Sequence, residues 1–186
     1  MTFTGFRMTM LNMNNIEIKF VKYVHDLGKG RIDSLTSFVS SIKMLAILWS
    51  VVLLISLIYF PNERMLLLQR VAIVTVLHFA ISEGIFKYLL PYFFGARKRP
   101  FVAYPNEINP IGHQFSDGSM PSSHIASTVA MVVVLSSIFP IMLIPGIAFS
   151  VLMGFSRIHN GMHYPSDVII GATLGISYGM AAIFFI

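Results

Sequence analysis

The chain contains a run of thirty-one residues, 125–155, without one charged side chain. As a single α-helix this run would measure about 46 Å at 1.5 Å per residue, well beyond a hydrocarbon core of roughly 30 Å. Pro140 and Pro145 lie near its middle, where proline interrupts a helix. The sequence therefore predicts a hairpin of two membrane-crossing helices, at 122–139 and 140–157.

Three other apolar stretches are long enough to cross a bilayer, namely 44–60, 65–94 and 168–186. Of all residues, 55% are apolar and 11% are charged, whereas a soluble domain has roughly 45–50% and about 25%. The chain has no cysteine, which excludes disulfides, thiolate ligands and a cysteine nucleophile. We expect an all-α integral membrane protein, a bundle of about five transmembrane helices preceded by amphipathic interfacial helices.

The N-terminal residues 1–40 differ in composition from the membrane domain, 41–186. Within 15–40, apolar side chains are mixed with lysines and a histidine, and the pattern breaks at Gly28 and Gly30. This mixture favours two short amphipathic helices that lie on the membrane surface. The alternative is an extra helix packed on the bundle.

The order of the crossings places several polar residues on one membrane face. Lys87 and Arg99 follow the second crossing, Ser122 and His124 open the third, and residues 156–167 link the fourth to the fifth. Three segments that are distant in the sequence are therefore expected to form one site.

The cations of this expected site suit a phosphate group. Arg99 and Arg157 are planar forks that bind two phosphate oxygens at once, and Lys87 is a point charge. Lys87 lies within an apolar helix, where charge is costly and therefore marks function, and Glu83 lies one turn earlier, at ion-pair spacing. Other basic residues near helix ends are expected to anchor lipid headgroups: Arg64, Arg70, Arg97 and Lys98.

Ser122, Ser123 and His124 follow a proline and precede a long apolar run, which is typical of a helix start. The free backbone amides and the positive end of the helix dipole attract anions there. Serine caps open many helices without any ligand, so the motif is weak alone. His124 carries more weight, because no other ionisable residue follows until Arg157.

His163 and Asp167 are four residues apart, with Pro165 between them. Proline suits the first turn of a helix, so His163 is expected in the preceding loop and Asp167 within that turn, close enough to pair. Such a carboxylate fixes the imidazole tautomer and leaves the other nitrogen free to attack. The alternative is a capping aspartate beside a surface histidine.

Together these motifs resemble the signature of the type 2 phosphatidic acid phosphatase family of membrane enzymes. That signature is a lysine with Arg-Pro, then Pro-Ser-Gly-His, then Ser-Arg, five residues, His, three residues and Asp. The third block is matched at every defined position, by Ser156, Arg157, His163 and Asp167. The resemblance makes residues 41–186 a transmembrane phosphatase domain.

The chain departs from the signature in two places. Ser123 stands where the family has glycine, and a residue this small still lets its amide approach phosphate. Eleven residues separate Lys87 from Arg99, a wide spacing that resembles bacterial lipid A 1-phosphatases. The resemblance thus favours lipid A 1-phosphate as the substrate, with undecaprenyl pyrophosphate and phosphatidylglycerophosphate as alternatives.

The resemblance implies a two-step displacement at phosphorus without a metal or other cofactor. His163 would be the nucleophile that forms a phosphohistidine, Asp167 its orienting partner, and His124 the general acid. The phosphoryl oxygens would be held by these residues: Lys87, Arg99, Arg157, Ser122 and Ser123. The implied partners are a phosphorylated lipid and the bilayer, with no nucleic acid.

The resemblance also implies a multi-pass protein of the bacterial inner membrane with its active site on the periplasmic face. The charges point the other way, because the motif-bearing face has more basic residues than the opposite face, and such residues favour the cytoplasmic side.

Two other classes of function fit parts of the pattern. A metal-dependent hydrolase would use His159 and His163 with Asp167, His113 or Asp117. A non-catalytic lipid-binding or transport protein would use only the cations.

The twenty residues 101–120 connect the first two motif blocks above the expected site and are rich in turn formers. A long loop of this kind is often functional. We expect a lid that selects the lipid headgroup, with His113 and Gln114 offering hydrogen bonds to the substrate.

Overall fold

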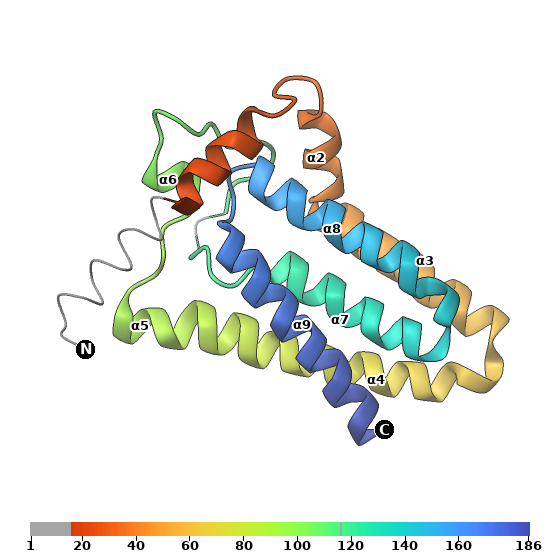
Figure 1. The fold of residues 1–186 in the computed structure, drawn as a ribbon. Helices are drawn as coiled ribbons and strands as arrows, with labels where there is room; N and C mark the ends of the chain where they lie inside the picture. The colour runs from red at the N-terminus through yellow and green to blue at the C-terminus, as the bar shows by residue number, and fades with distance from the viewer. Residues whose placement is uncertain (1–15, 116) are drawn as a thin grey trace.

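The computed structural model describes residues 16–115 and 117–186, and within them all regular structure is helical. Four helices are long and apolar enough to cross a membrane, and a shorter apolar helix of 16 residues, α7, runs among them (Figure 1). The predicted all-α membrane bundle of about five crossings is confirmed.

The first crossing is α3 (Ile42–Tyr59), and the turn η1 (Pro61–Glu63) leads into the second. The second is one continuous helix made of α4 (Arg64–Leu77), η2 (His78–Leu89) and α5 (Leu90–Phe94). The remaining elements follow in order: α6 (Pro100–Ala103), α7 (Ser123–Ile138), η3 (Pro140–Met142), α8 (Leu143–His159) and α9 (Pro165–Phe185). Every predicted crossing begins and ends within three residues of the observed helix.

Within the second crossing, η2 is a π-helix of 12 residues. Turns of this kind are rare and often lie at functional sites. Glu83 and Lys87 belong to η2, and Nζ of Lys87 lies 3.4 Å from the Glu83 carboxylate, as the sequence predicted. Ser82 of the same element shares a hydrogen bond of 2.9 Å with Tyr178 of α9, which joins two crossings inside the bundle.

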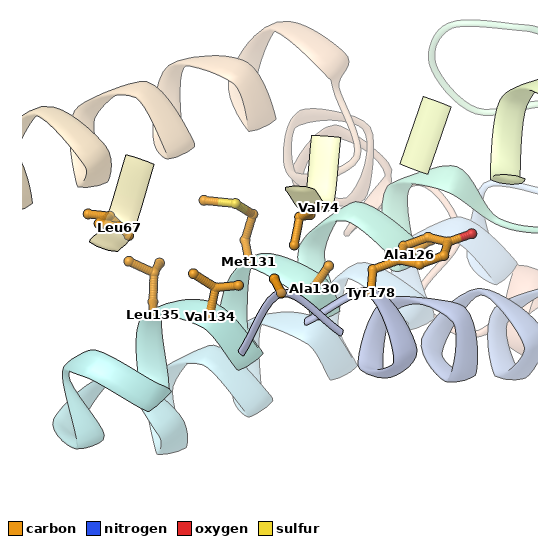
Figure 2. Close-up of a cluster of buried hydrophobic side chains, with 9 residues drawn as sticks. Leu67, Val74, Ala126, Ala130, Met131, Val134, Leu135 and Tyr178 are labelled. Carbon is orange, nitrogen blue, oxygen red and sulfur yellow. The ribbon is translucent and has the colours of Figure 1, made fainter. Parts of the chain in front are cut away.

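Helix α7 is the centre of the bundle, in contact with α4, α8 and α9. Figure 2 shows the cluster that its small and branched side chains form with Leu67 and Val74 of α4 and with Tyr178 of α9. By contrast, α3 buries only Leu45 and Ser56 and exposes most of its aliphatic side chains. A helix such as α3, which is apolar all round and exposed, is suited to contact with lipid. Helix α7 buries most of its side chains and is therefore surrounded by protein.

Two glycines of α9 bring this helix against α7. A Cβ atom added at Gly171 would lie 2.6 Å from the carbonyl oxygen of Ser122, and one added at Gly175 would lie 2.5 Å from that of Ala126. Small residues at four-residue spacing allow this close approach between membrane helices. The amide of Ser122 also donates to the carbonyl of Asp167 at 3.1 Å, so α9 holds the start of α7 in place.

The substitution Gly175→Ala should destabilise the bundle, because its methyl group meets backbone that cannot move aside alone. We expect the free energy of unfolding to fall by about 1–3 kcal/mol, the scale of overpacking in a tight core. Thermal unfolding in detergent measures the change. Ser177→Leu, at an exposed position of the same helix, is the matched control, and equal midpoints for both variants would contradict the close α7–α9 contact.

The N-terminal segment forms two short helices, residues 16–26 and α2 (Asp33–Val39). Two helices were predicted, and the first of them packs apolar side chains against the bundle, as in the alternative interpretation. Residues 1–15 of the predicted interfacial segment lie outside the described residues. Nδ1 of His25 donates to the carbonyl of His159, and Nδ1 of His159 donates to the carbonyl of Val24, both at 2.8 Å. This reciprocal pair fixes the first helix to the end of α8.

Candidate active site

A cavity of about 340 Å³ opens at the end of the bundle where α7 begins and α8 ends. Six of the eight predicted site residues line it: Lys87, Arg99, Ser123, His124, Arg157 and His163. The other two, Ser122 and Asp167, are fully buried beside it. The loops that join α5 to α7 and α8 to α9 meet at this end of the bundle (Figure 1). The expected convergence of three segments is therefore present.

The imidazole of His163 has a defined partner for each nitrogen. Nδ1 lies 2.6 Å from the carbonyl oxygen of Ser119, which can only accept, so Nδ1 carries the proton. Nε2 lies 3.2 Å from Nη1 of Arg99 and 3.2 Å from Nη2 of Arg157, both of which only donate. Nε2 therefore has its lone pair directed between two cations.

Burial, together with the charges of Arg157 and Arg99, holds the pKa of His163 well below its ordinary value of 6.5. The side chain is 1% exposed and lies in the loop between α8 and α9, as the sequence predicted. Protonation of this ring would place a third cation next to two others. Burial and the two neighbouring cations therefore favour the neutral form of the imidazole.

Asp167 contributes to this arrangement less directly than expected. Its Oδ2 lies 3.8 Å from Nδ1 of His163, within reach of an ion pair but too far for a hydrogen bond. The same oxygen accepts from the backbone amide of Tyr164 at 2.8 Å, because Pro165 begins α9 and places Asp167 in its first turn, where a carboxylate caps the preceding amide. Asp167 thus shapes the loop that carries His163, while Ser119 is the direct partner.

Arg97 was expected to anchor lipid headgroups, and the structure corrects this. Its Nη1 donates to Asp167 at 2.8 Å and to Ser166 at 2.7 Å, and its Nη2 donates to Glu17 at 2.5 Å. Burial alone would lower the pKa of the guanidinium, but the charges of Asp167 and Glu17 raise it. In an extended segment alternate residues share a face. The two-residue spacing of Arg97 and Arg99 therefore indicated that Arg97, like Arg99, is directed toward the protein, and the sequence analysis did not use this signal.

The wide spacing between Lys87 and Arg99 has a structural cause. Lys87 lies inside the second crossing, which continues to Phe94 before the chain turns back at Gly95, where φ is +80°. The extended residues that follow return Arg99 to the cavity, and Arg99 is 2% exposed. Lys98, between the two arginines, is exposed. Lys87 is therefore the lysine of the site.

A carboxylate from the loop before α7 lies between these two cations. Asp117 is 2.6 Å from Nζ of Lys87 through Oδ2 and 2.6 Å from Nη2 of Arg99 through Oδ1. On the other side of Lys87, Glu83 accepts from the hydroxyl of Ser123. Of the residues from 101–120, those that line the cavity are Phe115 and Asp117, whereas the expected His113 and Gln114 do not.

Among the polar atoms next to the cavity that lack a hydrogen-bond partner in the described residues, three belong to predicted site residues: Oγ of Ser122, Nε2 of His124 and Nε of Arg157. All three residues are at most 9% exposed. Buried donors of this kind are normally satisfied, so the group is arranged for an acceptor that binds there. Ser122 is the N-cap of α7 but its hydroxyl makes no cap bond, which leaves the hydroxyl free for such a ligand.

The residues of the metal alternative are dispersed. Among residues 16–115 and 117–186, no group of three or more histidine or carboxylate side chains is placed to hold an ion. His159 is directed away from the cavity, to the Val24 carbonyl at 2.8 Å and to Asp33 at 3.1 Å. Its role is to hold the N-terminal segment.

Comparison with known families identifies the arrangement. The model of the PAP2 superfamily matches residues 71–185. The chain belongs to this superfamily. A relative from Sulfolobus acidocaldarius, an undecaprenyl-diphosphatase, is 34% identical over 130 residues, which cover 63% of this chain and 58% of that protein.

Two solved structures share the fold. A transmembrane PAP2-type phosphatidylglycerolphosphate phosphatase from Bacillus subtilis superposes with a TM-score of 0.68 at 19% identity, over 94% of this chain and 86% of that one. Aquifex aeolicus LpxE superposes with a TM-score of 0.65 at 20% identity, over 91% and 95%. At such identities the likeness establishes the PAP2 membrane fold and leaves the substrate open.

Proposed function

We propose that this protein is a membrane lipid phosphatase that removes a terminal phosphoryl group through a phosphohistidine. The single observation that supports this best is the lone pair of His163 Nε2, directed between Arg99 and Arg157 at 3.2 Å from each. A neutral imidazole among cations is a nucleophile placed where a phosphate would bind. A protein that only bound phosphate would have no need for this tautomer.

In the proposed first step, Nε2 of His163 attacks phosphorus, and the bond from phosphorus to the lipid oxygen breaks. His124 donates its Nε2 proton to the departing oxygen. In the second step, water attacks phosphorus, one of its protons passes to His124, the bond from phosphorus to Nε2 of His163 breaks, and phosphate leaves. Asp167 and the Ser119 carbonyl keep the ring oriented throughout.

The charge that spreads over the phosphoryl oxygens would be stabilised by preorganised donors: Lys87, Arg99, Arg157, the Ser122 hydroxyl and the Ser123 amide. One well-placed donor contributes roughly 3–4 kcal/mol to such a transition state. The set provides the neutralisation that a metal ion supplies in other phosphatases, so we propose a metal-independent reaction.

The substrate is proposed to be a lipid that ends in a phosphate or diphosphate. The position of the cavity at one end of an apolar bundle supports a lipid substrate. The spacing of Lys87 and Arg99 favours lipid A 1-phosphate, whereas the relative from Sulfolobus favours a polyprenyl diphosphate. Phosphatidylglycerophosphate is the third candidate.

The test is phosphate release by the purified protein in excess chelator, across lipid A, undecaprenyl diphosphate, phosphatidylglycerophosphate and phosphatidic acid. We expect turnover of at least one lipid, unchanged by the chelator. Activity that chelator abolishes and zinc or magnesium restores would support the metal alternative. Binding without phosphate release from any lipid would support the non-catalytic alternative.

We further propose a bacterial inner-membrane location with the cavity on the periplasmic face, residues 1–40 forming an interfacial segment there. Because the chain has no cysteine, Lys98→Cys creates a single thiol on an exposed residue next to the site. In intact spheroplasts, a membrane-impermeant maleimide should label this variant and not Asn62→Cys, which lies at the other end of the second crossing. The reverse pattern would assign the site to the cytoplasm.

A further inference from the structure

The carboxylate of Asp117 occupies the place where the proposed phosphate would be held. Its two oxygens contact Nζ of Lys87 and Nη2 of Arg99, each at 2.6 Å, and its backbone carbonyl accepts from Nε of Arg99 at 3.1 Å. Both cations line the cavity together with His163. The donors that Asp117 satisfies are therefore the donors assigned to the substrate.

Asp117 is an anion under ordinary conditions. Burial alone would raise the pKa of its carboxyl, but the hydrogen bond from Lys87 and the charge of Arg99 lower it below the ordinary value of 3.8. The carboxylate lies in the loop before α7 and is about one third exposed, at 31%. It can therefore leave the cations by movement of the loop before α7, without disruption of a helix.

Two charged oxygens of a carboxylate and two of a phosphate compete for the same donors, since both are bound in a fork by arginine and as a point charge by lysine. The charged side chains that line the cavity are three cations, Lys87, Arg99 and Arg157, and two carboxylates, Glu83 and Asp117. With three positive and two negative charges, the cavity has a net charge of +1. Without Asp117 the other charged side chains have a net charge of +2, three cations and one carboxylate, which a dianionic ligand neutralises and a monoanionic ligand does not.

We propose that Asp117 is a specificity-determining residue, an internal competitor that a dianionic terminal phosphate or a diphosphate displaces and a monoanionic phosphodiester does not. The inference rests on the proposed phosphatase function and deepens it by naming the charge class of the substrate. A terminal phosphate has a second pKa near about 6 and is largely dianionic at neutral pH. Ordinary phospholipid headgroups are phosphodiesters, so they bring no more charge than the carboxylate that they would replace.

This role addresses a problem that the location creates. A site at a membrane end meets phosphodiester headgroups in great excess over any terminal phosphate. Specificity is a difference between two affinities and is often obtained by weakening the wrong partner. The carboxylate lowers the affinity for every phosphate, because each ligand must displace it from Lys87 and Arg99. A monoanion gains less binding free energy from these cations than a dianion does, so the cost of displacement is a larger fraction of what the monoanion gains.

The experiment measures binding, independently of turnover. Calorimetry with purified protein in detergent, in the His163→Ala background, gives the affinity for inorganic phosphate, with dihexanoyl phosphatidylglycerol as the phosphodiester competitor. Asp117→Asn removes the charge and preserves the shape. We expect it to bind phosphate about tenfold more tightly, the scale of one charge-assisted hydrogen bond, and to become sensitive to the phosphodiester, to which the parent protein is insensitive.

Glu107→Gln is the matched control, because Glu107 belongs to the same loop region and pairs with Lys22 away from the cavity. It should leave both affinities unchanged. Asp117→Ala, checked by its melting temperature, should behave as Asp117→Asn does.

Weaker phosphate binding in both Asp117 variants would overturn the inference and make Asp117 a positioning residue for Lys87 and Arg99. Equal affinity in parent and variants, or equal discrimination against the phosphodiester, would also overturn it while leaving the phosphatase proposal intact. If no protein in the series binds phosphate, the phosphatase proposal itself fails and the inference fails with it.

Discussion

Phosphate release should fall on the order of 10⁴-fold when His163 is replaced by alanine, because among residues 16–115 and 117–186 no other group is placed to attack phosphorus. In the described part of the chain, the lone pair of His163 is the one held between Arg99 and Arg157. The variant should still fold, since the ring makes one hydrogen bond to backbone, at Ser119, and loss of such a partner costs about 1–3 kcal/mol.

The measurement for His163→Ala combines a steady-state assay with trapping of a phosphorylated intermediate. The parent protein should form an acid-labile, base-stable phosphoenzyme, and the variant should form none. His113→Ala is the control, because His113 is an exposed histidine outside the cavity and should retain activity. Substantial turnover by pure His163→Ala protein would exclude the nucleophile assignment.

The second large effect is expected for Arg157→Gln. Arg157 is 2% exposed and donates to Nε2 of His163 from within the cavity. Loss of one such donor to a phosphoryl transition state should lower kcat by about 10²–10³-fold. The cation also contributes, after burial, to the low pKa of His163, so that pKa should rise in the variant.

The sign of the pH effect follows from the form of His163 that reacts in the proposed mechanism. The neutral imidazole is the proposed nucleophile, so on the acid limb of the pH profile activity should be lost as the pH falls through the pKa of His163, which burial and the charges of Arg157 and Arg99 hold well below its ordinary value. In Arg157→Gln the limb should move to higher pH. Arg70→Gln, on a residue that bonds Ser137 at the far end of the bundle, should leave both rate and profile unchanged. An unshifted limb in Arg157→Gln would contradict the electrostatic account.

The bundle could be predicted because its signals are local. Each crossing is a run without charge, bounded by turns or charged residues, and the membrane sets its length. The convergence of Lys87, His124 and His163 followed from the direction in which each crossing runs. Helix α7, which has 16 residues, is surrounded by protein. No feature of its composition indicated that protein rather than lipid would surround it.

The remaining parts of the site depend on loop conformation, which has no periodic signal. Ser119 acts through a backbone carbonyl, and every residue has one, so its identity predicts nothing. Asp117 gains its importance from where the loop returns it, next to two cations 18 and 30 residues earlier in the chain. Arg97 was misinterpreted because a basic residue near a helix end is usually solvated, whereas here two carboxylates surround it.

The bond between Glu17 and Arg97 means that the structural unit of the site is larger than the region that the family model matches. The family match begins at residue 71, yet Glu17 accepts from Arg97 and from the backbone amide of Ser166 at 2.9 Å, one residue from Asp167. A protein shortened to the matched region would keep every signature residue and lose the contacts of Glu17 with Arg97 and Ser166. A segment outside the family match thus holds Arg97 and the start of α9 in place, and grafting this end of the bundle onto another protein would require the helix at residues 16–26 as well.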